Sequence, residues 1–215
     1  MEVFLLVTAA WVFSVCLHEF GHALVAYHGG DTTVKEKGYL TLNPIHYSHP
    51  VYSLVMPLLF LFLGGMGLPG GAVYINEHLL RSRGWRTAVS LAGPAMNLLL
   101  VVLLCVPFWL GIMDERFGPA LAFLIQLQIS AILFNLVPIP PLDGFQAISP
   151  WLPAGIAERL MANSTAFMWA FILVLWYVPA ANAAFWTVVY TVSNLVGVDY
   201  ELARLGWWQF QFWQH

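Results

Sequence analysis

Long apolar runs without a formal charge limit what this chain can fold into more than any other feature. Residues 87–113, 117–142 and 160–198 contain no Asp, Glu, Lys or Arg, and residues 3–27 contain only Glu19. A helix needs roughly 20 mostly apolar residues to cross the hydrocarbon core of a bilayer, and every one of these runs is long enough. The sequence therefore predicts an all-α polytopic membrane protein.

Composition agrees with this class and narrows the range of partners. Hydrophobic residues make up 60% of the 215 residues and charged residues only 9%, whereas soluble domains carry about 25% charge. The net charge is −3 and no Lys/Arg-rich stripe or tail is present, so nucleic acid is not expected as a partner. We interpret residues 1–215 as a single transmembrane domain whose surroundings are the lipid bilayer.

The pattern of runs predicts about four to six membrane helices. Residues 3–165 form the expected core, and residues 165–197 form either one kinked membrane helix or a helical hairpin. The run 51–63 has only 13 residues and is followed by several glycines, so we expect a short re-entrant segment rather than a full span. A small β element is expected near 70–76. The aromatic tail 205–215 is typical of the membrane interface.

Basic residues predict how the chain is oriented. If the 51–63 run dips into the bilayer and returns, all the basic residues between the first and second long runs lie on one side of a cell membrane. The positive-inside rule makes this side cytoplasmic. It places the N-terminus outside and a site near the end of the first helix toward the cytoplasm. These basic residues are Lys35, Lys37, Arg81, Arg83 and Arg86.

A metal-binding motif, H-E-F-G-H, lies at residues 18–22 of the first apolar run. Residues four apart share one face of a helix, so the imidazoles of His18 and His22 can hold one ion. Glu19 is offset by about 100° and can take a proton from water beside that ion. Zinc with two His, one carboxylate and an open position holds a water whose pKa is near ~7. Alternatively, Glu19 and the imidazoles form a buried polar cluster without a metal.

Asp143 is the best candidate for a third ligand. It is the only acidic residue between Glu115 and Glu158, and it follows an apolar run that three prolines interrupt. Broken helices are tolerated at membrane depth only where protein or a water-filled cavity covers the freed backbone groups. Gly144 would allow a close backbone approach there. The alternative is an ordinary helix-ending turn with Asp143 at the surface.

Two separated motifs now allow a comparison with a known family. The H-E-F-G-H segment at 18–22, together with N-x-x-P-x-P-x-L-D-G at 135–144, resembles the site-2 protease family of intramembrane zinc metalloproteases. The segment L-A-G-P-A-M-N at 91–97 looks like the Gly-Pro-containing helix between those motifs. The resemblance covers about residues 3–165. It is closest to the minimal prokaryotic branch, whose members lack PDZ and nucleotide-sensing domains.

The resemblance implies one Zn²⁺ per chain, with His18, His22 and Asp143 as its ligands and Glu19 as the general base. Asn135 matches a family asparagine near the catalytic centre. A buried amide facing such a cleft could donate a hydrogen bond to the oxyanion of the reaction. A hydrogen bond between helices remains an equally open role for Asn135.

Four further residues are candidates for substrate binding. Gly71, Val73 and Tyr74 belong to the expected β element at 70–76, whose edge could hold an unwound substrate by strand addition. A plain loop is the alternative for this element. Asn97 lies in the helix between the two motifs, where helix packing is favoured over a direct role in substrate binding.

The loop after Asn43 departs from the family pattern. Members of the minimal branch often have a His and an Asp there, where this chain has Tyr47 and His49. His46 and His49 are three residues apart, which leaves a second metal site open. Loop histidines without further ligands are more often part of a polar surface.

The predicted function is therefore a zinc-dependent endopeptidase that hydrolyses peptide bonds in or near transmembrane segments, with a transmembrane protein or peptide as substrate. A proteolytically silent chaperone for membrane proteins is one alternative, although the intact Glu19 disfavours it. A zinc or proton carrier is another. Carriers need polar groups along a path across the membrane, and here the titratable groups gather at one depth. The sequence makes no prediction of oligomeric state.

Overall fold

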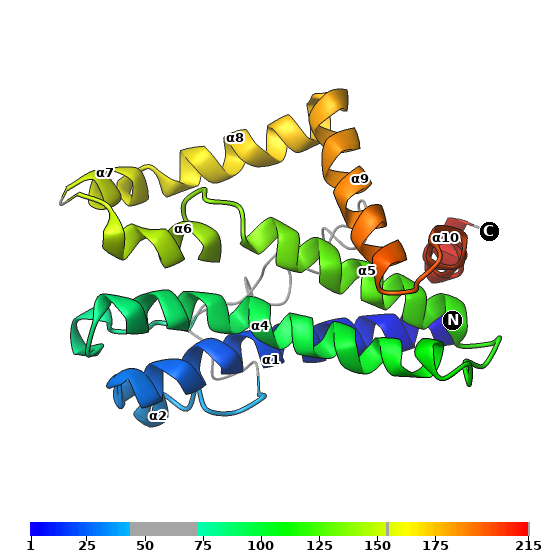
Figure 1. Ribbon diagram of the computed structural model, residues 1–215, viewed down its shortest axis with the longest axis horizontal. Coiled ribbons are helices and arrows are strands. Elements are labelled where there is room, and N and C mark those ends of the chain that lie inside the picture. The colour runs from blue at the N-terminus through cyan, green and yellow to red at the C-terminus, as the bar shows by residue number, and fades with distance from the viewer. Residues whose placement is uncertain (44–72, 154, 215) are drawn as a thin grey trace.

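The fold was analysed in a computed structural model that describes residues 1–43, 73–153 and 155–214. Every regular element in these residues is helical (Figure 1). The α-helices are α1 (Glu2–Gly29), α2 (Thr33–Glu36), α4 (Arg83–Trp109), α5 (Gly118–Asn135), α6 (Asp143–Ile148), α7 (Ile156–Ala162), α8 (Ser164–Tyr177), α9 (Pro179–Leu195) and α10 (Tyr200–Phe210). Short 3₁₀ turns are η2 (Glu77–Leu79), η3 (Ser149–Trp151) and η4 (Phe212–Gln214).

Three of these helices, α1, α4 and α5, are long and apolar enough to cross a membrane. A fourth span results if α7 and α8, which are bent by 66° relative to each other, act together. The prediction of an all-helical membrane protein is confirmed for the described residues. The number of spans stays a prediction, and the expected re-entrant segment at 51–63 lies outside the described residues.

The start of α4 and the end of α1 lie together. Gly30 ends α1 with a φ of 124°, a conformation that favours glycine. Ser82 caps α4, because its hydroxyl oxygen accepts a hydrogen bond from Trp85 N–H at 3.3 Å. The backbone N–H of Arg81 donates to Gly29 O at 3.0 Å, which joins the two helix ends. The site described below lies near this end of both helices.

Small residues let α1 and α4 cross closely. A Cβ added at Gly21 of α1 would lie 2.7 Å from Met96 Cγ and 2.9 Å from Ala92 O of α4. In membranes, such small residues permit backbone approaches that larger side chains prevent. The α5 helix is the most enclosed of the three spans, with 83% of its membrane window buried. Figure 1 shows it between α4 and the C-terminal helices.

The apolar run 165–197 forms two helices, not one. Val178 separates α8 from α9, and Pro179 starts α9 at a position where its missing N–H costs no hydrogen bond. The chain turns sharply between the two helices (Figure 1). Val189 of α9 is fully buried and packs against Ile125 and Ile129 of α5, so α9 returns to the core.

Part of the aromatic tail is buried rather than interfacial. Phe210 at the end of α10 is fully buried, in a cluster with Val7 and Trp11 of α1 and Phe123 of α5. Trp208 is exposed, in keeping with a place at the interface. The tail therefore ties the C-terminus to the N-terminal half of α1.

A substitution at Gly206 tests the contact between α10 and α5. A Cβ added there would lie 2.0 Å from Pro119 O, a backbone atom with little freedom to move. Gly206→Ala is therefore expected to lower the free energy of unfolding by about 1–3 kcal/mol while zinc binding persists. Thermal unfolding of the purified protein in detergent measures the first effect, and zinc content measures the second. Unchanged stability would show that α10 does not pack as closely as described.

The expected β element is not seen in its described part. Residues 73–76 have no regular secondary structure, although Asn76 has extended backbone angles of φ −87° and ψ 93°. A strand needs a neighbour for its backbone hydrogen bonds, and here side chains provide the partners of several of these groups. Residues 70–72, including Gly71, lie outside the described residues.

Candidate metal centre

Two imidazoles on α1 form the core of the candidate site. His18 and His22 are one helical turn apart and buried, and their Nε2 atoms are 3.0 Å from each other. The i and i+4 spacing places both rings on the face of α1 that meets α4. The motif at residues 18–22 is therefore helical and inward-facing, as the sequence predicts.

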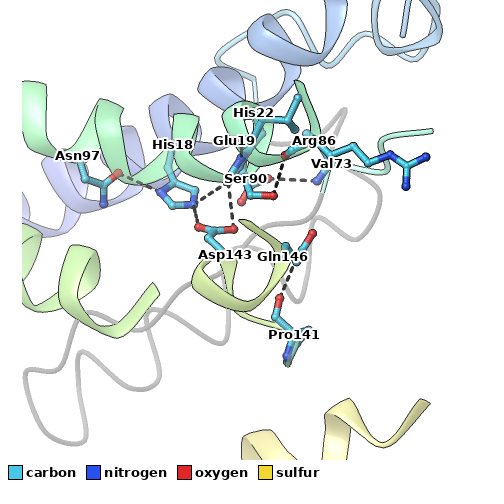
Figure 2. A network of polar contacts seen from close by, with 11 residues as sticks. His18, Glu19, His22, Val73, Arg86, Ser90, Asn97, Pro141, Asp143 and Gln146 are labelled. Atoms are coloured by element: carbon cyan, nitrogen blue, oxygen red, sulfur yellow. Dashed lines mark hydrogen bonds and ion pairs between the residues drawn. The ribbon is translucent and has the colours of Figure 1, made fainter. Parts of the chain in front are cut away.

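Asp143 supplies a third ligand atom from a distant part of the chain. It is the first residue of α6 and follows the proline-containing segment after α5. Its Oδ2 is 3.2 Å from His18 Nε2, and its Oδ1 is 3.5 Å from His22 Nε2 (Figure 2). One ligand atom from each of these three residues lies within 4.8 Å of the others, so the three residues can share one ion.

A glycine brings Asp143 into place. A Cβ added at Gly144 would lie 2.2 Å from Leu136 O and 2.8 Å from Val137 O, so only glycine lets the start of α6 approach the end of α5 this closely. At the far end of α6, Thr87 Oγ1 of α4 donates to Ala147 O at 2.7 Å. Contacts at both ends of α6 thus fix this short helix, and with it the position of the Asp143 carboxylate.

The outer ring nitrogens of both histidines have hydrogen-bond acceptors. His18 Nδ1 is 3.1 Å from Asn97 Oδ1, and His22 Nδ1 is 2.7 Å from Val89 O. A backbone carbonyl can only accept, so His22 carries its proton on Nδ1. The same assignment for His18 leaves both Nε2 lone pairs facing Asp143. Partners of this kind are what fix the ring orientation of metal-binding histidines.

The donor set fits zinc. Asp143 Oδ2 is buried and makes no hydrogen bond. Two Nε2 lone pairs at 3.0 Å repel each other unless a cation lies between them, and tetrahedral zinc with Zn–N near 2.0–2.1 Å separates its ligands by about 3.3 Å. A Cβ added at Gly93 would come within 2.3 Å of His22 Nε2 and 2.5 Å of His18 Nε2. The missing side chain of Gly93 therefore leaves open the space beside both ligand atoms.

Glu19 opens onto a cavity of about 300 Å³ next to the three ligand residues. Its side chain is buried, and its Oε2 accepts a hydrogen bond from Val73 N–H at 3.1 Å. The cavity has a mixed polar and apolar wall. Its lining residues are His18, Glu19, His22, Val73, Ile75, Val89, Ser90, Asn135, Pro141, Leu142, Asp143, Gln146 and Met168.

The remaining candidates divide into those that reach the cavity and those that do not. Asn135 and Val73 line it. Tyr74 is 68% exposed, and its backbone carbonyl accepts from Lys37 Nζ at 3.0 Å outside the cavity. Asn97 is buried behind His18 and is absent from the cavity wall, which favours a supporting role over substrate contact. Gly71 lies outside the described residues, as do His46 and His49.

Some contributors to the site carry no signal in the sequence. Val89 acts through its backbone carbonyl, which every residue type possesses. Met168 lines the cavity as an ordinary apolar residue. Gly93 belongs to the Gly-Pro segment at 91–97, and the structure shows that the space left by its missing side chain lies at the imidazoles themselves.

A substitution at Asn97 tests the hydrogen bond that orients His18. Asn97→Leu keeps the approximate volume but removes the acceptor, and loss of such a partner typically lowers metal affinity about 10- to 100-fold. Asn97→Asp keeps an acceptor oxygen and is expected to retain most of the affinity. Competition with a chelator of known zinc affinity measures both. Equal losses in the two variants would show that packing, not the hydrogen bond, is what matters.

The geometry defines a class of protein: a helical membrane metalloprotein with a His-His-Asp site and a glutamate beside it. Two comparisons find no counterpart, since no family model and no solved structure matches the chain. Curated relatives do match. The chain is 43% identical over 222 residues to the "Putative zinc metalloprotease Rip2" of Mycobacterium tuberculosis, covering 98% of this chain and 82% of the relative. Identity to the protein of the same name in Mycolicibacterium smegmatis is 44%, with the same coverage.

A more distant relative comes from another bacterial group. The chain is 30% identical over 190 residues to the "Putative zinc metalloprotease YwhC" of Bacillus subtilis, with 83% of each protein covered. The chain belongs to the site-2 protease family of zinc metalloproteases. Its cofactor is Zn²⁺, and the described residues provide the group His18, His22 and Asp143 for it.

Proposed function

We propose that this protein is an intramembrane endopeptidase that hydrolyses peptide bonds in or near transmembrane segments of other membrane proteins. One observation carries the proposal: Glu19 and the three ligand residues surround one cavity, and three of these four residues belong to a helix long and apolar enough to cross a membrane. Ionisable groups inside such helices are costly and are rarely kept without a function. The names of the curated relatives support a protease.

The residues divide the chemistry between them. His18, His22 and Asp143 would hold zinc, which when bound supplies a Lewis acid and lowers the pKa of a water ligand. The Glu19 carboxylate takes a proton from the attacking water and returns it to the leaving amine. Asn135 lies on the cavity wall, where its amide N–H can donate to the oxygen on which negative charge develops.

A substrate must unfold locally before it reacts. A transmembrane helix pairs all its backbone groups internally, so its peptide bonds are not available to a nucleophile. Val73 and Ile75 line the cavity, and no hydrogen bond in the described part of the chain involves the backbone N–H or C=O of Ile75. These groups can pair with an unwound substrate segment by strand addition.

The proposed location is the cell membrane, with the site toward the cytoplasm. Gly29 at the end of α1 is hydrogen-bonded to Arg81 just before α4, so Lys37, Arg81 and Arg83 lie at the same end of the molecule as the metal centre. Clustered basic residues beside a membrane helix mark the cytoplasmic side. The orientation is tested with protease-cleavable tags placed at each terminus and at the basic end of the molecule. In vesicles of known orientation, the tag at the basic end should be accessible only from the cytoplasmic side.

Cleavage by purified protein tests the function itself. Wild-type protein in liposomes is expected to cleave a model protein with one transmembrane helix, to stop when a chelator removes zinc, and to resume when zinc is restored. Zinc-loaded protein that cleaves none of several such substrates would contradict the proposal. In that case zinc flux across the same liposomes would indicate a carrier, and stable retention of uncleaved substrate would indicate a chaperone.

A further inference from the structure

A buried carboxylate lies outside the metal centre and has no part in the chemistry above. Asp31 follows the glycine pair that ends α1, and its exposed fraction is 0%. Its Oδ1 accepts hydrogen bonds from the backbone N–H of Thr33 at 3.1 Å and from Thr33 Oγ1 at 2.6 Å. Its Oδ2 accepts from the backbone N–H of Asn76 at 2.7 Å. A buried charge is costly unless it is hydrogen-bonded, and here both oxygens have donors.

The bond to Asn76 joins Asp31 to the segment that meets the general base. Residues 73–76 are held at three points by side chains: Glu19 accepts from Val73 N–H, Lys37 Nζ donates to Tyr74 O at 3.0 Å, and Asp31 accepts from Asn76 N–H. The Lys37 ammonium also lies 4.8 Å from the centre of the Tyr74 ring. Two of these three hydrogen bonds, those made by Asp31 and Lys37, therefore come from the residues that follow α1.

With residues 73–76 fixed by these three hydrogen bonds, Ile75 faces the cavity. Its side chain lines the cavity with that of Val73, while the flanking residues Tyr74 and Asn76 bind back to Lys37 and Asp31. Val73 N–H is also taken, by Glu19. Ile75 is therefore the residue of this segment whose backbone N–H and C=O make no hydrogen bond within the described part of the chain, and these groups are open to a ligand.

We propose that Asp31 is a positioning residue for peptide hydrolysis, which fixes the register of residues 73–76 relative to Glu19 and so determines which substrate bond is presented for cleavage. This inference rests on the proposed function. A one-residue slip between paired strands moves every side chain to the opposite face and shifts the backbone along by one residue. Loosening the anchor should therefore change where the enzyme cuts as well as how fast.

Asp31→Asn tests this role with little change in shape. A carboxylate offers two acceptor oxygens, whereas an amide offers one and presents N–H donors on the other side. The amide of the variant can therefore accept from Thr33 or from Asn76, but not from both. We expect full zinc content, a kcat about 10-fold lower, a smaller change in KM, and cleavage spread to neighbouring bonds as mapped by mass spectrometry of the products.

Thr33→Val is the matched control, because it removes one donor to Asp31 but keeps the bond to Asn76. Its rate and cleavage sites are expected to stay within about twofold of wild type. Asn76→Pro removes the donor N–H itself and should reproduce the spread of cleavage sites. Asn76→Ala keeps that N–H but loses the side-chain oxygen that accepts from His78 N–H, so the difference between the Pro and Ala variants reports the N–H alone.

Hydrogen–deuterium exchange gives a readout that does not need activity. The Asn76 amide is expected to exchange about 10-fold faster in Asp31→Asn than in wild type or Thr33→Val. Unchanged exchange, or an active Asp31→Asn enzyme with the wild-type cleavage pattern and rate, overturns the inference while the proposed function stands. A wild-type protein that cleaves no substrate overturns the proposed function, and this inference with it.

Discussion

Glu19→Gln is expected to abolish peptide hydrolysis while the protein keeps its zinc. The amide has nearly the shape of the carboxylate, and its oxygen can still accept the hydrogen bond from Val73 N–H, so the local structure should persist. An amide does not take a proton from water at neutral pH. Loss of a general base typically costs about 10²–10⁴-fold in rate.

Cleavage of a model transmembrane substrate, measured beside zinc content on the same preparations, checks this prediction. Glu36→Gln is the control, because Glu36 is an exposed acid of α2 and its substitution makes the same change in charge. It should cleave at the wild-type rate. A Glu19→Gln protein that still cleaves within about tenfold of wild type would remove Glu19 from the role of base.

The helical part of the site could be predicted from the sequence because its geometry is local. His18, Glu19 and His22 are fixed relative to one another by the α-helix alone, and a long apolar run is expected to be helical in a bilayer. Asp143 needed more. It comes from a separate helix 121 positions after His22 in the printed sequence, and only the broken, proline-rich segment before it and the resemblance to a known family indicated that it returns to α1.

The features of the site and fold that could not be predicted depend on backbone atoms or on contacts between segments distant in the sequence. The Val89 carbonyl that orients His22 has no residue signature. The partners of residues 73–76 are side chains rather than a second strand, so a short β-like pattern was expected to form a β element that the described residues do not show. The burial of Phe210 depends on where α10 docks against α1 and α5, which no local pattern specifies.

Gly93 shows how a distant helix can decide whether the ligands bind at all. Gly93 belongs to α4, yet an added Cβ would lie closer to His22 Nε2 and His18 Nε2, at 2.3 and 2.5 Å, than any non-bonded carbon can. Both imidazoles are also held from behind, by Asn97 and by the Val89 carbonyl. They cannot withdraw without losing these hydrogen bonds, so the methyl group and a metal ion compete for the same space.

Gly93→Ala is therefore expected to lower zinc affinity by about 10- to 100-fold, since overpacking costs about 1–3 kcal/mol where neighbours cannot move and 1.4 kcal/mol corresponds to about tenfold in affinity. Activity should be lost with the metal and return only partly in excess zinc. Gly84→Ala, in the same helix, is the matched control, because its added Cβ meets only Ser82 Oγ at 3.6 Å. Metal analysis after dialysis against a weak chelator measures both variants, and thermal unfolding of the metal-free proteins shows whether each is folded. A folded Gly93→Ala protein that retains one zinc per chain would mean that α4 does not border the metal site as described.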